Sequence, residues 1–337
     1  MTRSMSLPPP TAPMQIMPGF ALAMEQTKRL LFRPFNAGTW LSVGMMLFLA
    51  SFVDSAAIPN VNLKLPGGSP SGGGIDVSAL LKPARAWVDD HAGLILPIAL
   101  GAAVFFIPLT IGLVWLGSRG QMMVLRAVAL NDVSFGSNWG ASQGSAWQLF
   151  KLRLVLVTLD SIANFAIFAL VVRRVLQLAD AGLADPFAYL KELVPMFVLF
   201  AVMLLGQGMI DFAIRHFVAP LMLRFDLSPT DGVRAFFTIL SGNFPQMLGY
   251  LVLRAVLAVG IGVAAGIIGV VTCCVGTLPV LSQILTAPLH VFDRAYTLYV
   301  LQSLGPAYQM ITPEPPPPAY PFYPPPPQQA FSGGFSR

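Results

Sequence analysis

Charged side chains are scarce in this sequence. Asp, Glu, Lys and Arg together make up 10% of its 337 residues, against about 25% in soluble globular proteins. Hydrophobic residues make up 55%. This composition excludes an ordinary soluble enzyme, and it also excludes a disordered chain, which combines low hydrophobicity with high charge. It predicts an all-α, polytopic integral membrane protein whose main partner is the lipid bilayer.

Potential metal ligands are also scarce. The only two cysteines, Cys273 and Cys274, are adjacent, and there are three scattered histidines. Adjacent cysteines rarely form a disulfide because the ring that they would close is strained. No spacing typical of a metal site occurs. We therefore predict no disulfide framework, no metal site and no cofactor.

The sequence signatures of catalysis are missing. The sequence has no glycine-rich dinucleotide loop, no Walker loop, no HExxH motif and no GxSxG motif. It also has no group of histidines and carboxylates that suggests general acid–base catalysis. These absences predict a protein that is not an enzyme. The net charge of +5 usually faces anionic lipid in a membrane protein, so a nucleic-acid partner is not expected.

Long apolar stretches dominate the chain. Each is long enough to cross about 30 Å of hydrocarbon. The six predicted transmembrane helices lie near 38–58, 94–116, 152–172, 194–214, 247–271 and 278–301. An inside N-terminus puts 14 of the 20 Lys and Arg residues on the cytoplasmic side, as the positive-inside rule requires. We predict a multi-pass protein of the plasma (inner) membrane with both termini in the cytoplasm.

Two shorter segments are predicted to be amphipathic helices at the membrane surface. Residues 19–34 alternate apolar side chains with basic ones. Residues 229–241 follow Ser228, Pro229 and Asp231, which read as an N-cap, a proline at the first helical position and an acid at the third. Together with the six spans they form a transmembrane domain at 19–305.

Proline-rich tails flank this domain. Residues 1–18 and 306–337 are predicted to be disordered, since both are rich in proline. The second tail contains two runs of four prolines separated by aromatic residues. Such a segment favours polyproline II and can dock on an aromatic-lined groove of a cytoplasmic protein partner. A simple spacer is the alternative.

Three charged residues inside predicted spans are the candidate binding residues: Asp160, Asp211 and Arg254. Charges in hydrocarbon are costly and often mark a binding site or a path for a solute. By depth, Arg254 is predicted to meet Asp160 or Asp211 in the inner half of the bundle. The alternative is that these charges form ion pairs that only fix the order of the helices.

A stripe of small residues marks the fifth predicted span. Ala258, Gly262 and Gly266 are spaced four apart and are expected to allow close helix packing.

The second half of the chain resembles a poorly characterised group of bacterial and archaeal six-span membrane proteins. This group includes the membrane domain found beside glycerophosphodiester phosphodiesterases. The similar motifs are LSPTDGVRA at 227–235, SGNF at 241–244 and PLHVFDRAY at 288–296. They are patterns of membrane entry and exit, so the resemblance implies a six-helix membrane protein with interfacial helices and no transferable active site.

Two functions follow as hypotheses. The first is a non-enzymatic membrane protein that organises or binds membrane components or partner proteins. The second is a transporter or channel for a small solute, ion or lipid that uses the intramembrane charges.

Overall fold

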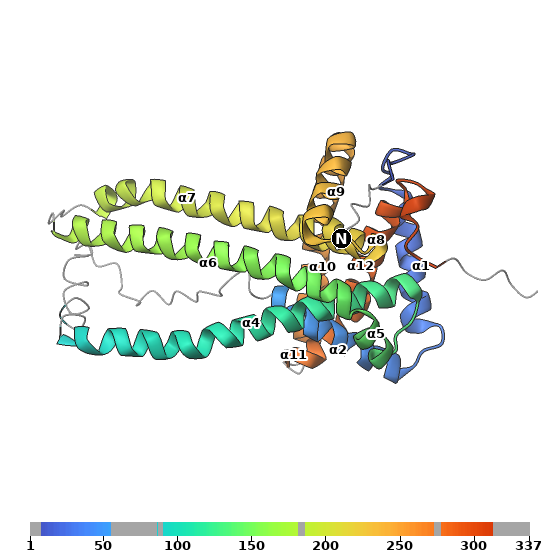
Figure 1. Cartoon of the computed structure of the whole chain (residues 1–337), viewed down its shortest axis with the longest axis horizontal. Helices are drawn as coiled ribbons and strands as arrows, with labels where there is room; N and C mark the ends of the chain where they lie inside the picture. The colour runs from blue at the N-terminus through green and yellow to red at the C-terminus, as the bar shows by residue number, and fades with distance from the viewer. Residues whose placement is uncertain (1–7, 55–85, 87–89, 181–185, 273–277, 313–337) are drawn as a thin grey trace, which may run out of the picture.

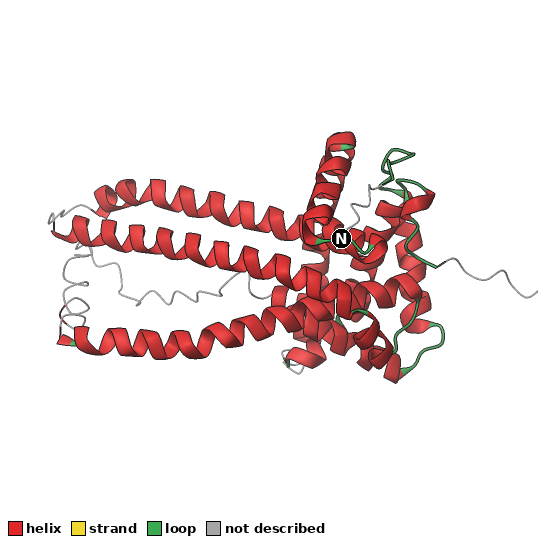
Figure 2. Cartoon of the chain, viewed as in Figure 1, coloured by secondary structure: helices red, strands yellow, loops and turns green. Residues whose placement is uncertain are grey.

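The computed structural model describes residues 8–54, 86, 90–180, 186–272 and 278–312. Figure 2 shows that these residues form helices and loops, with no strand among them. In chain order the helices are α1 (Pro18–Phe32), α2 (Ala37–Asp54), α4 (Ala92–Leu130), α5 (Phe135–Ala141), α6 (Gln143–Asp180), α7 (Pro186–Ala213), the π-helical turn η2 (Ile214–Val218), α8 (Ala219–Phe225), α9 (Pro229–Gly242), α10 (Phe244–Val271), α11 (Pro279–Leu285), α12 (Ala287–Gln302) and the short 3-10 helix η4 (Pro306–Tyr308).

Four helical stretches of the described chain are long and apolar enough to cross a membrane. They are Pro97–Leu130, Gln143–Leu178, Lys191–Phe225 and Phe244–Val271. The pair α1 and α2, which meet at a bend of 118°, adds a fifth candidate if the two helices count as one span. The chain is therefore all-helical within the described residues, with four or five candidate membrane-spanning helices.

The predicted spans agree with these helices in part. The stretches predicted at 152–172, 194–214 and 247–271 each lie inside one of the four candidates, and the stretch at 94–116 begins three residues before its candidate, within α4. The candidates are longer than predicted because they continue beyond the apolar region. The first prediction, 38–58, corresponds to α2, and its last four residues lie outside the described part of the chain. The count of six spans is not confirmed.

The sixth predicted span is two helices in the structure. α11 ends at Leu285 and α12 begins at Ala287, with a break at Thr286. Pro288 lies in the first turn of α12, where a missing backbone N–H costs nothing, and it cannot continue a helix from α11. Most side chains of α12 are buried against other helices. This segment is absent from the candidate spans because neither helix is long enough.

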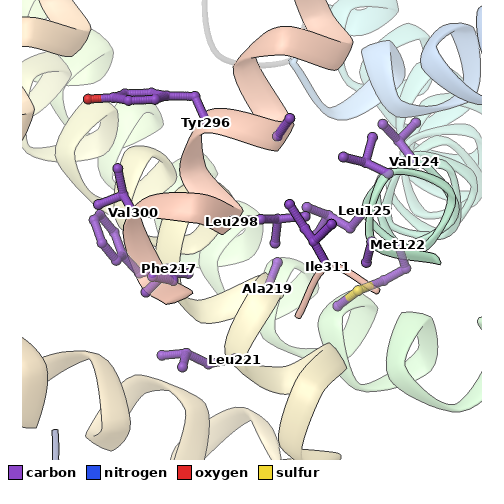
Figure 3. Close-up of a cluster of buried hydrophobic side chains, with 14 of the residues drawn as sticks. Met122, Val124, Leu125, Phe217, Ala219, Leu221, Tyr296, Leu298, Val300 and Ile311 are labelled. Carbon is purple, nitrogen blue, oxygen red and sulfur yellow. The ribbon is translucent and has the colours of Figure 1, made fainter. Parts of the chain in front are cut away.

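The hydrophobic core lies at one end of the long helices. Figure 1 shows α4, α6 and α7 running side by side away from this end. The core joins the C-terminal part of α4 to η2, α8 and α12 (Figure 3). By contrast, large apolar side chains remain exposed along the rest of α4, α6, α7 and α10, and only Met247 and Tyr250 of α10 are buried. Apolar surface of this extent suits contact with lipid.

Helices α2 and α4 cross at unusually short range. A Cβ atom added at Gly120 of α4 would lie 2.6 Å from the carbonyl carbon of Leu49 in α2, and Gly117 one turn earlier faces Val53 in the same way. The glycines thus allow the two backbones to touch. The glycines of the predicted small-residue stripe, Gly262 and Gly266, have no such neighbour within 4 Å.

Both predicted amphipathic helices form. α1 buries its inner face against α12 and keeps Glu25 on the outer face, where that carboxylate pairs with Arg33 at 2.9 Å. α9 begins as predicted, because the Ser228 hydroxyl accepts a hydrogen bond from the backbone N–H of Asp231 at 3.3 Å. Their predicted place at the membrane surface stays a prediction.

The tails differ from the prediction where the structure describes them. Residues 8–16 lie on the end of α12: the amide of Thr11 donates to the carbonyl of Leu304 at 2.9 Å, and the amide of Met14 donates to Asn243 at 3.2 Å. The second tail begins later than predicted, since Tyr308 is fully buried and the amide of Thr312 donates to Ala129 at 2.9 Å. Proline content misled here because proline also suits extended segments held by side-chain partners. Residues 1–7 and 313–337 lie outside the described residues.

Candidate functional site

A cavity of about 380 Å³ lies where α2, α4, α6 and α7 meet. Two polar stripes face it. Arg153 and Asp160 on α6 are seven residues apart, and Gln207 and Asp211 on α7 are four apart, so each pair lies on one face of its helix. The remaining wall is mostly apolar: Val53, Val114, Leu156, Val157, Leu159, Ala163, Met203, Gly206, Ile210 and Ile214. Two of the three predicted residues, Asp160 and Asp211, therefore line one cavity.

Asp211 is held by two guanidinium groups. Its Oδ2 lies 2.9 Å from Nη2 of Arg215, one turn along the same helix, and its Oδ1 lies 3.8 Å from Nη2 of Arg153. Arg153 is only 3% exposed and also donates to the side-chain oxygen of Gln121 on α4. This arrangement ties α4, α6 and α7 together through one carboxylate, as expected for a charge that fixes helix order.

Asp160 is different. Within the described residues its carboxylate makes no hydrogen bond and no ion pair; only its backbone carbonyl accepts a bond, from Asn164 at 2.8 Å. Nearby in the cavity wall, the buried amide nitrogen of Gln207 also lacks a hydrogen-bond partner. A carboxylate in a candidate membrane span without a partner is costly. The carboxylate of Asp160 can therefore bind the polar part of a ligand whose apolar part fills the rest of the cavity.

Arg254 does not meet Asp160 or Asp211, so that prediction is wrong. The N-terminal part of α10 packs beside η2 and α12, away from the cavity. There Arg254 pairs with Asp293 of α12 and lies 2.9 Å from Nε2 of His216 in η2. The depth of a residue along the membrane normal does not reveal which helices are neighbours, so it could not identify Asp293 as the partner of Arg254.

Arg254 belongs to a buried hydrogen-bonded network around Thr297. Nδ1 of His216 lies 2.9 Å and the hydroxyl of Tyr250 lies 3.0 Å from the Thr297 hydroxyl, which donates to the carbonyl of Asp293 at 3.1 Å. A guanidinium only donates, so His216 accepts through Nε2 and its proton lies on Nδ1. The N–H at Nδ1 of His216 and the hydroxyl of Tyr250 then donate to the two acceptor positions of the Thr297 hydroxyl. Every one of these groups is satisfied, which identifies a structural joint between η2, α10 and α12.

The π-helical turn places His216 in this joint. Such turns insert one extra residue into an α-helix and often occur at functional sites. Here the turn leaves the carbonyl of Arg215 to accept from Arg294 at 3.4 Å, and it turns His216 inward. His216, Tyr250 and Thr297 were not predicted from the sequence. A signal was present, because Tyr250 and Arg254, and likewise Asp293 and Thr297, are spaced four apart on one helix face.

No group of three His, Cys, Asp or Glu side chains that could hold a metal ion occurs among the residues that the structure describes.

Across the residues that the structure describes, the fold is that of an all-helical protein with four or five candidate membrane-spanning helices. Residues 17–285 match DUF7544, which is described as a family of unknown function. The chain belongs to this family, since the match covers most of its length. No curated protein and no solved structure matches the chain. The resemblance to the membrane domain beside glycerophosphodiester phosphodiesterases stays a prediction.

Proposed function

We propose that this protein is a non-enzymatic, multi-pass membrane protein that binds an amphiphilic membrane component in the cavity between α2, α4, α6 and α7. The observation that carries the proposal is the carboxylate of Asp160, which faces this cavity without a partner among the described residues. In a low-dielectric environment a carboxylate requires a cation, hydrogen-bond donors or a proton. A ligand with a protonated amine supplies the first two at once.

The volume and lining of the cavity are consistent with an amphiphilic ligand. Its volume of about 380 Å³ suits a small ligand or part of a lipid. Four of the residues that line it are polar and the other ten are apolar. The helices that form it also carry exposed apolar side chains, among them Phe165 of α6 and Val202 of α7. A membrane-embedded ligand can therefore reach the cavity sideways, from the lipid.

The proposed topology has six spans with both termini in the cytoplasm of a plasma (inner) membrane. Support comes from the charge distribution: the basic residues Arg126, Arg224 and Arg294 lie at the core end of the molecule, whereas the far ends of α6 and α7 carry few, such as Arg174. Under the positive-inside rule the core end faces the cytoplasm. A protein partner for the proline-rich residues 313–337 belongs to the same proposal.

Native mass spectrometry of the protein, released gently from its own membrane, tests the binding. We expect a reproducible bound amphiphile on the wild type and its loss from Asp160→Asn. The matched control is Asp226→Asn, which removes the same charge from an exposed loop where a left-handed backbone suits asparagine equally well. Unchanged binding in Asp160→Asn, with normal helicity and elution volume, would refute the proposal.

Transport of the same ligand is the second candidate function. It is favoured by the π-helical turn that follows Asp211 on α7 and by the break at Thr286, since interrupted helices accompany binding sites in many transporters. Proteoliposome flux of the ligand identified above distinguishes the two functions. A carrier moves it across the bilayer and loses this activity in Asp160→Asn, whereas a binding protein holds the ligand without flux.

A further inference from the structure

A second cavity, of about 460 Å³, lies between α4 and the start of α6. Trp115 and Arg119 of α4 form one wall, and Gln143, Gly144, Ala146 and Trp147 of α6 form the other. It is separate from the cavity that contains Asp160, with which it shares no lining residue. No carboxylate of a described residue contributes to its lining.

Arg119 is the charged group of this cavity. Its side chain is only 8% exposed. The guanidinium lies 4.0 Å from the ring centre of Trp139 and 5.6 Å from that of Trp115, and its Nη2 donates to the carbonyl of Trp139 at 2.8 Å. The rings and this hydrogen bond fix the position of the positive charge.

The charge of Arg119 is not balanced by the part of the chain that the structure describes. Its buried Nε has no hydrogen-bond partner, and it forms no ion pair there. Arg254, in contrast, pairs with Asp293. A buried guanidinium in a candidate membrane span without a counter-charge is costly, so the arrangement calls for an anion.

The surroundings favour an anion carried by a lipid. Trp115 and Trp147 are of the residue type that gathers at the level of lipid headgroups. The ammonium of Lys151, one turn after Trp147, lies 5.8 Å from the ring centre of Trp147 and adds a second positive charge at the edge of the cavity. Trp139, which stacks on Arg119, also lines an apolar hollow of about 380 Å³ with Met45, Leu49, Leu116 and Phe135. The charged cavity can thus hold a headgroup while the apolar hollow contacts its chains.

We propose that this cavity binds the phosphodiester of an anionic membrane lipid, with Arg119 as its principal ligand. The guanidinium donates to the phosphate oxygens, and Gln143 supplies an amide donor. A headgroup with net negative charge fits better than a zwitterionic one, because no carboxylate is present to pair with a choline. This site does not depend on the function proposed for Asp160.

The test is lipid retention in native mass spectrometry with defined lipids. Purified protein is titrated with dioleoylphosphatidylglycerol or dioleoylphosphatidylcholine, which have the same chains. We expect the wild type to prefer the anionic lipid and Arg119→Gln to lose that preference by at least about tenfold, as expected for a lost charge-assisted hydrogen bond. Arg234→Gln is the matched control, since its side chain is 81% exposed on α9.

Two further variants and a soluble competitor complete the test. Arg119→Lys retains the charge and is expected to retain most of the preference. If Arg119→Gln does not fold, Lys151→Gln is used, for which we expect a smaller loss of severalfold. The proposal is overturned if the variants at Arg119 and Lys151 keep the wild-type preference. It is also overturned if soluble glycerophosphate competes as well as the lipid does, which would indicate a site for a free phosphate compound.

Discussion

The crossing of α2 and α4 gives the sharpest prediction about this fold. At Gly120 the two backbones touch, and Gly120→Ala adds a single Cβ atom at that point. The new atom would lie 2.6 Å from the carbonyl carbon of Leu49 and 2.7 Å from its Cβ. Ordinary contacts between carbon atoms are about 3.5–4.0 Å, so α2 must move away by about 1 Å.

The magnitude follows from two opposing effects. Replacing glycine by alanine inside a helix stabilises it by about 1 kcal/mol. Overpacking costs about 1–3 kcal/mol, and the upper part of that range applies because the obstructing atoms include backbone, which cannot rotate away. We expect Gly120→Ala to destabilise the protein by about 2 kcal/mol net. Gly262→Ala in α10, where no atom lies within 4 Å of the added Cβ, retains only the favourable effect.

The measurement is the free energy of unfolding in mixed detergent, obtained by titration with sodium dodecyl sulfate and followed by circular dichroism. Gly120→Ala is expected to unfold at a lower fraction of denaturing detergent than the wild type, and Gly262→Ala at an equal or higher one. The two variants should differ by about 3 kcal/mol. Equal stability of the two variants would refute the close crossing of α2 and α4 and, with it, the position of the core end of α4.

Three further predictions concern local hydrogen bonds. Ser228→Ala removes the N-cap of α9 and is expected to cost about 1 kcal/mol in the same titration, and an unchanged midpoint would show that the cap is not formed. Tyr308→Phe removes the hydrogen bond from its hydroxyl to the carbonyl of Pro8 at 2.8 Å. We expect a loss of about 1 kcal/mol and faster hydrogen exchange at the amides of Thr11 and Ala12, which donate to the carbonyl of Leu304; unaltered exchange would argue against the docked N-terminal segment. The backbone N–H and the hydroxyl of Ser134 hold the pKa of Asp132 below its usual value. The stability that Asp132 adds is therefore complete above about pH 4 and is lost as the pH falls through the lowered pKa. The melting temperature of Asp132→Asn should therefore fall less steeply with decreasing pH than that of the wild type. Identical profiles of melting temperature against pH would contradict this.

Local signals in the sequence predicted the helices well. The apolar stretches at 94–116, 152–172, 194–214 and 247–271 each lie within one long helix, and the start of α9 follows from Ser228 and Pro229. These features depend on residues close together in the chain. Hydropathy over about 20 residues and capping at fixed offsets are both readable without knowledge of the fold.

Features that depend on neighbours across the fold were predicted poorly. Gly262 and Gly266 have the spacing of a packing motif but touch nothing nearby, whereas Gly117 and Gly120, without that spacing, bring two backbones together. A helix pattern indicates which face could pack but not whether a partner is present. The docked residues 8–16 were missed for the same reason, since their partners lie more than 200 residues away.

The charged residues show what this distinction means for function. Depth and periodicity identified Asp160, Asp211 and Arg254 as unusual, but each has a different role that only its neighbours decide. Asp211 lies between two guanidinium groups and Arg254 pairs with Asp293, so both are balanced within the chain. Asp160 and Arg119 are not balanced by any described residue. Because an uncompensated charge in hydrocarbon is far more costly than a paired one, these two positions are where a ligand from outside the chain lowers the free energy most, and their opposite signs call for two different ligands.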